Sequence, residues 1–526
     1  MPVMETSRLL AMSVVVLALF VSYRYYAFRY RMPPGPRGLP IIGNLHQAPS
    51  KYPWRTFADW HKKYGPIYSL QFGPTTLIML GTHDAARDLL DKRSNIYSSR
   101  PKLFMVGEII SKGFRTLLLP YGQRWRIHHR LHASVLNQRI AQTYHDMQDL
   151  ESKQLIAELL TRSDFSDRFH RYASSVILSL AYGKRMPRGD ESEIKSVDEI
   201  MVPLNAALAS QWIVDVFPFL NALPGFLAPW KKHGENLHKI EADFFKDVMD
   251  RARTKPSWNW SKELQSMKES DNLCHTELAY ILGVVYEAGS DIVSMVLETF
   301  VMAAVLHPAV VQKAHEELDR VIGRGRLPTF ADLDRLPYVH AIVKETHRWR
   351  PVIPGGVPHA VDEDDEYMGY HIPKGAVVLG NHWAIHLDPD VYEKPMDFNP
   401  DRWIEHPDLP LAGFGFGRRK CVGQYVGTNS LLINVARILW AYDIGHAYEE
   451  HHGRKVRCEV DSFAFTNGFN SGPLRFKAQF SVRSAEAEEI MKREWNDAEK
   501  NVDVLLDGIR DIQLQEKHAF QAKQFA

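Results

Sequence analysis

The segment FGFGRRKCVG carries one of only three cysteines in 526 residues. A cysteine binds a metal as the thiolate, which nearby positive charge or a helix N-terminus stabilises. Cys421 has Arg419 two residues before it, and a helical pattern begins directly after it. Gly417 and Gly423 permit a positive φ and a close approach of a ligand to the backbone. Phe414 can pack over the sulfur and keep water away from it.

A thiolate in a dry loop beside glycines and an arginine suits haem, whose iron takes the sulfur axially and whose propionate takes the arginine. The spacing Phe-x-x-Gly-x-Arg-x-Cys-x-Gly resembles the haem-binding signature of the cytochrome P-450 family. The resemblance covers about residues 33–483 and is closest to microsomal members of fungal secondary metabolism. It implies haem b as the cofactor, Cys421 as the axial iron ligand, and Phe414, Gly417, Arg419 and Gly423 around the haem.

A second pair of residues matches the family's E-x-x-R motif. Glu345 and Arg348 are three positions apart on a predicted helix, so they share a face and can pair. In the family an arginine from an F-x-P-x-R segment joins them, and Arg402 matches it here. The resemblance implies a buried ionic network that supports the cysteine loop and takes no part in catalysis.

Two further segments resemble parts of the family that contact the haem propionates. WRIHHR begins at Trp125, and the family usually has an arginine where this chain has His129. The resemblance implies that Trp125 and His129 contact one propionate, with Arg130 as an alternative to the missing arginine. His359 matches a position that often contacts the other propionate.

The chain departs from the family on the opposite side of the haem. Ala288, Gly289 and Asp291 match the A-G-x-[D/E]-T motif, but Ile292 replaces the threonine. In the family that hydroxyl helps to bind oxygen and to deliver protons, and isoleucine has no hydrogen-bonding group. Three interpretations stay open. A substrate hydroxyl or water replaces the threonine in a monooxygenase, or the reaction is a desaturation, ring coupling or rearrangement, or the protein binds haem in a membrane without turnover.

The segments that must position these residues are mostly helical. The apolar segment 277–308 predicts a long helix through the centre of the fold, and 338–351 predicts a second helix that ends at a proline. Short strands are expected within 67–81 and 365–380. No clear linker divides the chain between them. We therefore expect a mainly α fold with small β-sheets, forming a single large haem domain over residues 45–483.

The N-terminus is predicted to be a membrane anchor. The apolar run 9–28 has about the length of a bilayer-spanning helix and lacks a signal-peptide cleavage site. Arginines after the run place the catalytic domain on the cytosolic side. We expect a single-pass anchor at 1–31 in the endoplasmic reticulum membrane and a Pro/Gly-rich hinge at 32–44. Residues 484–526 are interpreted as a charged, solvated C-terminal extension.

The composition limits the partners of the protein. The chain has 64 Lys and Arg against 63 Asp and Glu, a net charge of +1, which argues against a nucleic-acid partner. The three cysteines are too few and too scattered for a disulfide framework. His446, His451, His452 and Cys458 form a loose cluster, which we interpret as a polar loop rather than a metal site.

The family resemblance implies a hydrophobic small-molecule substrate, O2 as co-substrate and electrons from an NADPH-dependent flavoprotein reductase. The segment 215–230 is either a loop that covers the core or a lid that dips into the membrane. The substrate pocket is expected to be walled by Phe104–Val106, Ala288, Val352–Val357 and Phe465–Phe469. Five basic residues form either a reductase-docking face or ordinary solvated charge: Arg124, Arg126, Arg130, Arg418 and Lys420.

Overall fold

The computed structural model describes residues 12, 31–162, 164–209 and 212–524. The predicted membrane anchor, residues 1–31, therefore lies outside the described residues except for Met12 and Arg31. Within the described ranges one helix, His275–Leu306, is long and apolar enough to cross a membrane. Since 67% of its apolar window is buried inside the protein, this helix is part of the core.

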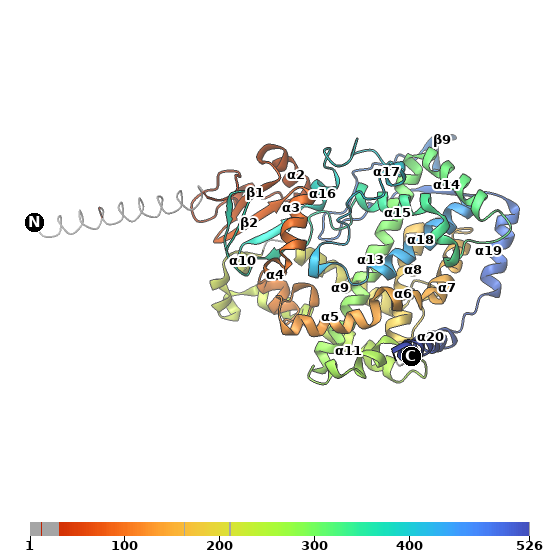
Figure 1. Ribbon diagram of the computed structural model, residues 1–526, viewed down its shortest axis with the longest axis horizontal. Helices are drawn as coiled ribbons and strands as arrows, with labels where there is room; N and C mark the ends of the chain where they lie inside the picture. The colour runs from red at the N-terminus through yellow and green to blue at the C-terminus, as the bar shows by residue number, and fades with distance from the viewer. Residues whose placement is uncertain (1–11, 13–30, 163, 210–211, 525–526) are drawn as a thin grey trace, which may run out of the picture.

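The centre of the fold is this long helix, α13 (His275–Leu306). It begins where the Cys274 sulfur accepts the Glu277 N–H at 3.4 Å, and it ends at His307 because Pro308 starts the next helix. Figure 1 shows α13 running between helices from both halves of the sequence. Its main neighbours are α8 (Phe165–Tyr182), α11 (Pro229–Arg253), α15 (Pro337–Trp349) and α18 (Gln424–Ala441).

The other helices cover this centre on all sides, as Figure 1 shows. The predicted fold, mainly α with small β-sheets, is confirmed. The remaining helices are α2 (Pro53–Tyr64), α3 (His83–Ala86), α4 (Ser94–Tyr97), α5 (Gln123–Leu136), α6 (Gln138–Gln142), α7 (His145–Glu158), α9 (Ser192–Ala209), α10 (Ile213–Val216), α12 (Trp260–Gln265), α14 (Pro308–Val321), α16 (His382–His386), α17 (Asp401–Glu405), α19 (Ala485–Asp497) and α20 (Val502–Gln524).

The largest sheet has four strands in the order β1-β2-β6-β3. β1 (Ile67–Phe72) and β2 (Thr75–Leu80) are antiparallel and joined at Gly73, which has a φ of 56°. β6 (Val377–Gly380) runs parallel to β2, and β3 (His359–Ala360) pairs with β6. The three two-stranded sheets are formed by β4 (Asp365–Tyr367) with β5 (Tyr370–Ile372), β7 (Tyr442–His446) with β10 (Ala478–Val482), and β8 (Tyr448–His451) with β9 (Arg454–Arg457).

The loose histidine and cysteine cluster is part of an exposed hairpin. His451 ends β8, and the turn at His452 leads into β9, so the expected polar loop is a short two-stranded sheet. Among the described residues, no group of three or more His, Cys, Asp or Glu side chains is placed to hold a metal ion.

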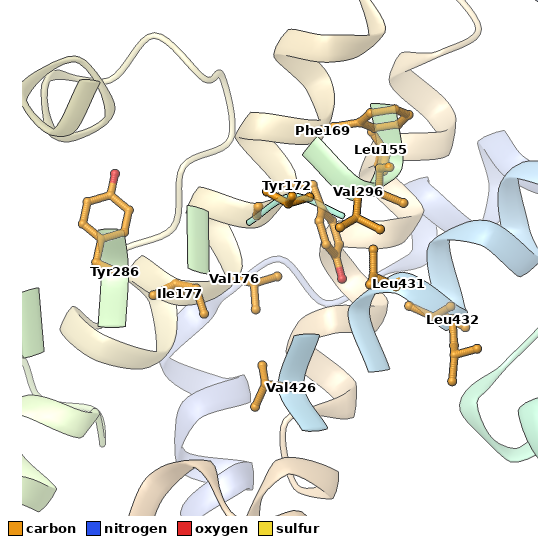
Figure 2. Close-up of a cluster of buried hydrophobic side chains, with 14 of the residues drawn as sticks. Leu155, Phe169, Tyr172, Val176, Ile177, Tyr286, Val296, Val426, Leu431 and Leu432 are labelled. Atoms are coloured by element: carbon orange, nitrogen blue, oxygen red, sulfur yellow. The ribbon is translucent and has the colours of Figure 1, made fainter. Parts of the chain in front are cut away.

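The main hydrophobic core joins α8, α13 and α18. Figure 2 shows Tyr172 of α8 pointing toward Val296 of α13 and Leu431 of α18. All three side chains are buried. Because α18 follows the cysteine loop directly, this core fixes that loop relative to the central helix.

The predicted solvated C-terminal extension is wrong, because both of its helices pack on the domain. α19 lies against α7 and buries Ile490 and Met491, and α20 buries Leu506 and Ile509. In Figure 1 the chain ends beside the helical body rather than away from it. In α19 Ile490 and Met491 follow the buried Ala487 by three and four positions, and in α20 Leu506 and Ile509 are three positions apart, so each helix has one narrow apolar face within a charged sequence.

Candidate active site

A cavity of about 390 Å³ lies between α13 and the loop that precedes α18. Its wall is mostly apolar and joins α5, α8, α9, β3 and the cysteine loop. Four of the residues labelled in Figure 2 belong to this wall, namely Val176, Ile177, Val296 and Val426. The buried core of the protein therefore continues directly into the cavity.

Cys421 lies in the cavity wall at the start of α18. Its N–H donates to the Phe414 carbonyl oxygen at 2.8 Å, and the helix begins at Gln424, as predicted. Phe414 also lines the cavity, and its ring centre lies 5.1 Å from that of His347. The loop therefore presents the sulfur to the cavity from a fixed backbone.

The glycines of this loop have different roles. Gly417 has a φ of 53°, and a Cβ atom there would lie 2.2 Å from the Leu90 carbonyl oxygen, so a side chain is excluded. Gly423 has a φ of −83°, so the expected positive φ at this position is wrong. Gly415, with a φ of 76°, is the second left-handed glycine of the loop. Gly423 lies on the cavity wall, where the absence of a side chain leaves room beside the sulfur.

Among the groups that the protein itself supplies, desolvation raises the pKa of the Cys421 thiol more than the hydrogen bond from the Gly423 N–H lowers it. A metal ion bound to the sulfur reverses this balance, since metal binding releases the thiol proton.

Two arginines give this end of the cavity a positive charge. Arg100 is buried and donates to the carbonyl oxygens of Val357 at 3.1 Å and Pro358 at 2.6 Å. Arg419 donates to the Ser98 carbonyl at 2.7 Å. Within the described part of the chain, neither guanidinium forms an ion pair with a carboxylate. Burial lowers the pKa of both arginines, that of Arg419 to about 10.

The other predicted propionate contacts line the same end. The Arg419 guanidinium lies 4.5 Å above the buried ring of Trp125, whose centre is 4.8 Å from that of His129. Burial and the charge of Arg419 lower the pKa of His129. His359 donates from Nδ1 to the Tyr97 carbonyl at 2.7 Å.

Arg130 is not the replacement for the missing arginine. It is exposed and lies 3.6 Å from Glu269, away from the cavity wall. Arg100 takes the place beside the cavity, although nothing in its local sequence distinguishes it from a surface arginine. Two unpaired guanidiniums and a thiol around one cavity fit a haem, whose two propionates and iron would use all three groups.

The predicted ionic network is present and fully buried. Both oxygens of Glu345 accept from Arg348, at 2.8 and 2.7 Å, and one also accepts from Arg402 at 3.2 Å. The Trp403 indole N–H and the Asn399 backbone N–H, both at 2.9 Å, complete the set of donors. Neither of these two was predicted from the sequence.

The network reaches the cysteine loop through one histidine. Arg348 donates to the His386 carbonyl oxygen at 2.9 Å, and Nε2 of His386 accepts the Ala412 N–H at 2.9 Å. Ala412 in turn accepts a hydrogen bond from Gly415. The supporting role expected for Glu345 and Arg348 therefore has a continuous structural path.

The central helix presents Ala288, Gly289 and Ile292 to the cavity. Asp291 lies outside the cavity wall, with its carboxylate 3.4 Å from Nε2 of His170 on α8. Successive helical residues are about 100° apart, so Asp291 and Ile292 point in different directions. Where the family has a threonine facing the cavity, this chain thus has the aliphatic side chain of Ile292.

The expected pocket wall is partly confirmed. Ala288, Val352, Ile353, Val357 and Phe469 line the cavity. Phe104–Val106 belongs to a neighbouring helical turn instead, and α9 supplies the wall that this segment was expected to form. The α9 residues are Met201, Leu204, Asn205 and Leu208.

Comparisons with known proteins agree with this geometry. Residues 33–452 match the family model for cytochrome P-450. The chain is 44% identical over 499 residues to the cytochrome P-450 monooxygenase FrzL of Cladobotryum sp, covering 94% of this chain and 96% of that protein. It is also 44% identical over 482 residues to the cytochrome P-450 monooxygenase aneD of Aspergillus aculeatus, covering 91% and 93%.

A solved zebra fish cytochrome P-450 with abiraterone has the same fold. It superimposes with a TM-score of 0.68 at 22% sequence identity, covering 82% of this chain and 100% of that structure. Together with the thiol, the two cavity arginines and the buried glutamate network, these relationships establish that the chain belongs to the cytochrome P-450 family and is a cytochrome P-450 monooxygenase.

Proposed function

We propose that the protein binds haem b through Cys421 and oxidises a hydrophobic intermediate of fungal secondary metabolism. The observation that carries the proposal is a cavity with a cysteine sulfur and two arginines without carboxylate partners at one end and a mostly apolar wall elsewhere. When bound, a haem with a thiolate ligand supplies the activation of O2 that an oxygen insertion needs. The fungal relatives named as monooxygenases support the metabolic setting.

The chain's own residues then have distinct tasks. Cys421 supplies the thiolate, and Arg100 and Arg419 bind the two propionates together with Trp125, His129 and His359 on the cavity wall. Ile292 and the other aliphatic side chains exclude water and hold an apolar substrate near the reacting centre. Arg348 and Glu345 keep the cysteine loop in place without touching the cavity.

Proton delivery is the step for which the α13 part of the wall offers no hydroxyl. Ser290 lies 3.5 Å from the Glu287 carbonyl, and Ser294 lies 3.3 Å from Glu298, so both hydroxyls are engaged away from the cavity. The substrate or a water molecule must therefore supply the hydrogen bond that threonine would make. This feature also favours a second candidate function, namely a desaturation, ring coupling or rearrangement that depends less on such a relay.

The proposed electron donor is an NADPH-dependent flavoprotein reductase. Of the five basic residues considered, Arg124 is bound to Glu277 and Arg130 faces Glu269. The other three, Arg126, Arg418 and Lys420, are exposed. Two of them contact the same tyrosine: the guanidiniums of Arg126 and Arg418 are 5.1 and 5.0 Å from the Tyr121 ring centre. We assign the docking face to Arg126, Arg418 and Lys420.

The proposed location is the cytosolic face of the endoplasmic reticulum membrane. The segment 215–230 exposes Phe219 and Phe226, whose exposed fractions are 72% and 84%. Ile41 of the hinge is 83% exposed, and the adjoining Ile42 carbonyl accepts the Gly73 N–H at the strand turn. Since a Cβ atom on Gly73 would touch Val216, the two exposed apolar segments lie at one end of the molecule. They support a membrane-dipping lid beside the predicted anchor.

The test is the spectrum of the reduced holoprotein with carbon monoxide, followed by NADPH consumption in membranes that contain reductase. We expect an absorption band at the position characteristic of a thiolate ligand, and Cys421→Ala should abolish it. An unchanged spectrum in that variant would show that the ligand is wrongly assigned. A normal spectrum without substrate-dependent NADPH use over a broad panel would instead contradict the enzymatic function.

A further inference from the structure

A second charged cluster, besides Arg100 and Arg419, interrupts the apolar wall of the cavity. Arg115 and Glu287 both line the cavity, and their side chains are only 4% and 3% exposed. Arg115 forms ion pairs with Glu287 of α13 and with Glu241 of α11. Nε of Arg115 also donates to the Ser111 hydroxyl at 3.2 Å.

This cluster has more negative than positive groups. Two buried carboxylates share one guanidinium, so a fully ionised cluster carries one uncompensated negative charge. Oε2 of Glu241 is buried without a hydrogen-bond partner among the described residues. A buried surplus charge is costly unless a proton or a cation compensates it.

The surroundings do not supply that positive charge. Among the described residues, two tyrosines lie near Glu287 in addition to Arg115 and Glu241, and one histidine lies near Glu241. Burial raises the pKa of both tyrosines and lowers that of the histidine, so all three are neutral near pH 7. They are Tyr182 on α8, Tyr280 on α13 and His238 on α11.

The two charged regions of the cavity, at Arg100 and Arg419 and at Glu287, therefore differ in their net charge once haem is bound. The propionates compensate Arg100 and Arg419, whereas the carboxylate surplus beside Glu287 remains. We propose that the Arg115–Glu287–Glu241 cluster is a recognition site for a positively charged nitrogen on an otherwise hydrophobic substrate. This inference rests on the proposed haem function and narrows its substrate class to molecules with one basic nitrogen.

The protonation of Glu287 is consistent with this role. Burial and the charge of Glu241 raise the pKa of Glu287 to about 8 against the opposing effect of Arg115. A proton thus compensates the surplus at neutral pH when no cation is present, and an entering cation displaces it. Binding of a cation should become tighter as the pH rises through this value.

The experiment compares two ligands of equal shape in the holoprotein. Phenylpropyl-trimethylammonium cannot bind iron through its nitrogen, and its isostere carries a neutral tert-butyl group in place of the trimethylammonium group. Binding is followed by the change in the haem spectrum and by the thermal shift. We expect a preference of about tenfold for the ammonium ligand, after correction for hydrophobicity, growing by about another tenfold between about pH 6.5 and 8.5.

Two variants remove the surplus charge without leaving an unpaired arginine. Glu287→Gln and Glu241→Gln each leave one carboxylate for Arg115, so both should fold and both should lose the preference and its pH dependence. Glu298→Gln changes another carboxyl of α13, which is half-buried and outside the cavity wall, and should keep both.

The outcomes separate the inference from the proposed function. An equal preference in the wild type and Glu287→Gln, or no preference in the wild type, overturns the cation site. If the cation site is overturned but the neutral isostere still shifts the haem spectrum, the proposed haem-dependent function is retained. If the reduced protein shows no thiolate band with carbon monoxide, the proposed function itself fails.

Discussion

Asp291 faces His170 across the interface between α13 and α8, with 3.4 Å between Oδ1 and Nε2, and does not face the cavity. His170 also lies 3.6 Å from Asp198 on α9. Asp291, the acidic residue of the family motif, therefore belongs to a group of one histidine and two aspartates on the side of the central helix that faces α8 and α9. The residue that lines the cavity next to Asp291 in the sequence is the aliphatic Ile292.

The pair predicts a pH-dependent contribution to stability. Burial lowers the pKa of His170, but the hydrogen bond that His170 donates to Asp291 and the charges of Asp198 and Glu298 outweigh it, so the net shift is upward. The stabilisation is therefore fully present below the unfolded value of about 6.5 and fades as pH rises through the folded value. Asp291→Asn should cost about 1 kcal/mol near pH 6 and less near pH 8.

The measurement is the apparent Tm of the holoprotein at both pH values. His170→Gln alone and the double variant serve as controls, because the two single losses should not add if the residues interact. Equal destabilisation by Asp291→Asn at pH 6 and pH 8 would contradict the pairing.

Local sequence motifs predict the cysteine side of the site well. Cys421, Gly417 and the pair Glu345–Arg348 are where their spacing places them, because a short loop or one helical turn determines their geometry. Motif matching predicts less about Asp291, since the same 100° step that brings Ile292 to the cavity turns Asp291 away from it.

Contacts between distant segments could not be predicted in this way. Arg100 reaches the cavity only because the β3 region brings the carbonyls of Val357 and Pro358 beside it. Likewise, α19 and α20 have few apolar residues among many charged ones. The surface that buries these apolar residues includes α7, which lies more than three hundred positions earlier in the chain. Neither partner can be recognised from the local sequence.

Arg100 should be needed for haem retention. Arg100→Met removes one of the two cavity guanidiniums, so we expect the rate of haem transfer from the ferric protein to apomyoglobin to rise about tenfold or more, equivalent to about 1.4 kcal/mol. Arg130→Met is the matched control, because that side chain is exposed and faces Glu269. Faster transfer from the Arg130 variant than from the Arg100 variant would reverse the assignment.

Glu345 should be needed for the folded, haem-bound state. Glu345→Ala leaves Arg348 and Arg402 buried without their carboxylate, which costs about 3–5 kcal/mol and should remove most of the soluble holoprotein. Glu393→Ala is the control, since its side chain is 88% exposed and only its backbone carbonyl accepts from Arg402. Haem content per protein in the two variants checks this, and a similar content in both would show that the network is dispensable.

Ile292 should determine how efficiently electrons from NADPH reach the product. Ile292→Thr and Ile292→Val give side chains of nearly equal shape, so the pair isolates the hydroxyl from the change in volume. Because the wall offers no other free hydroxyl on α13 within the described structure, the threonine variant should change the ratio of product to NADPH by about twofold or more relative to the valine variant. The ratio is measured in reductase-containing membranes with any substrate that the holoprotein turns over. Equal ratios in the two variants would mean that the substrate or water already supplies this hydrogen bond, or that the reaction does not depend on it.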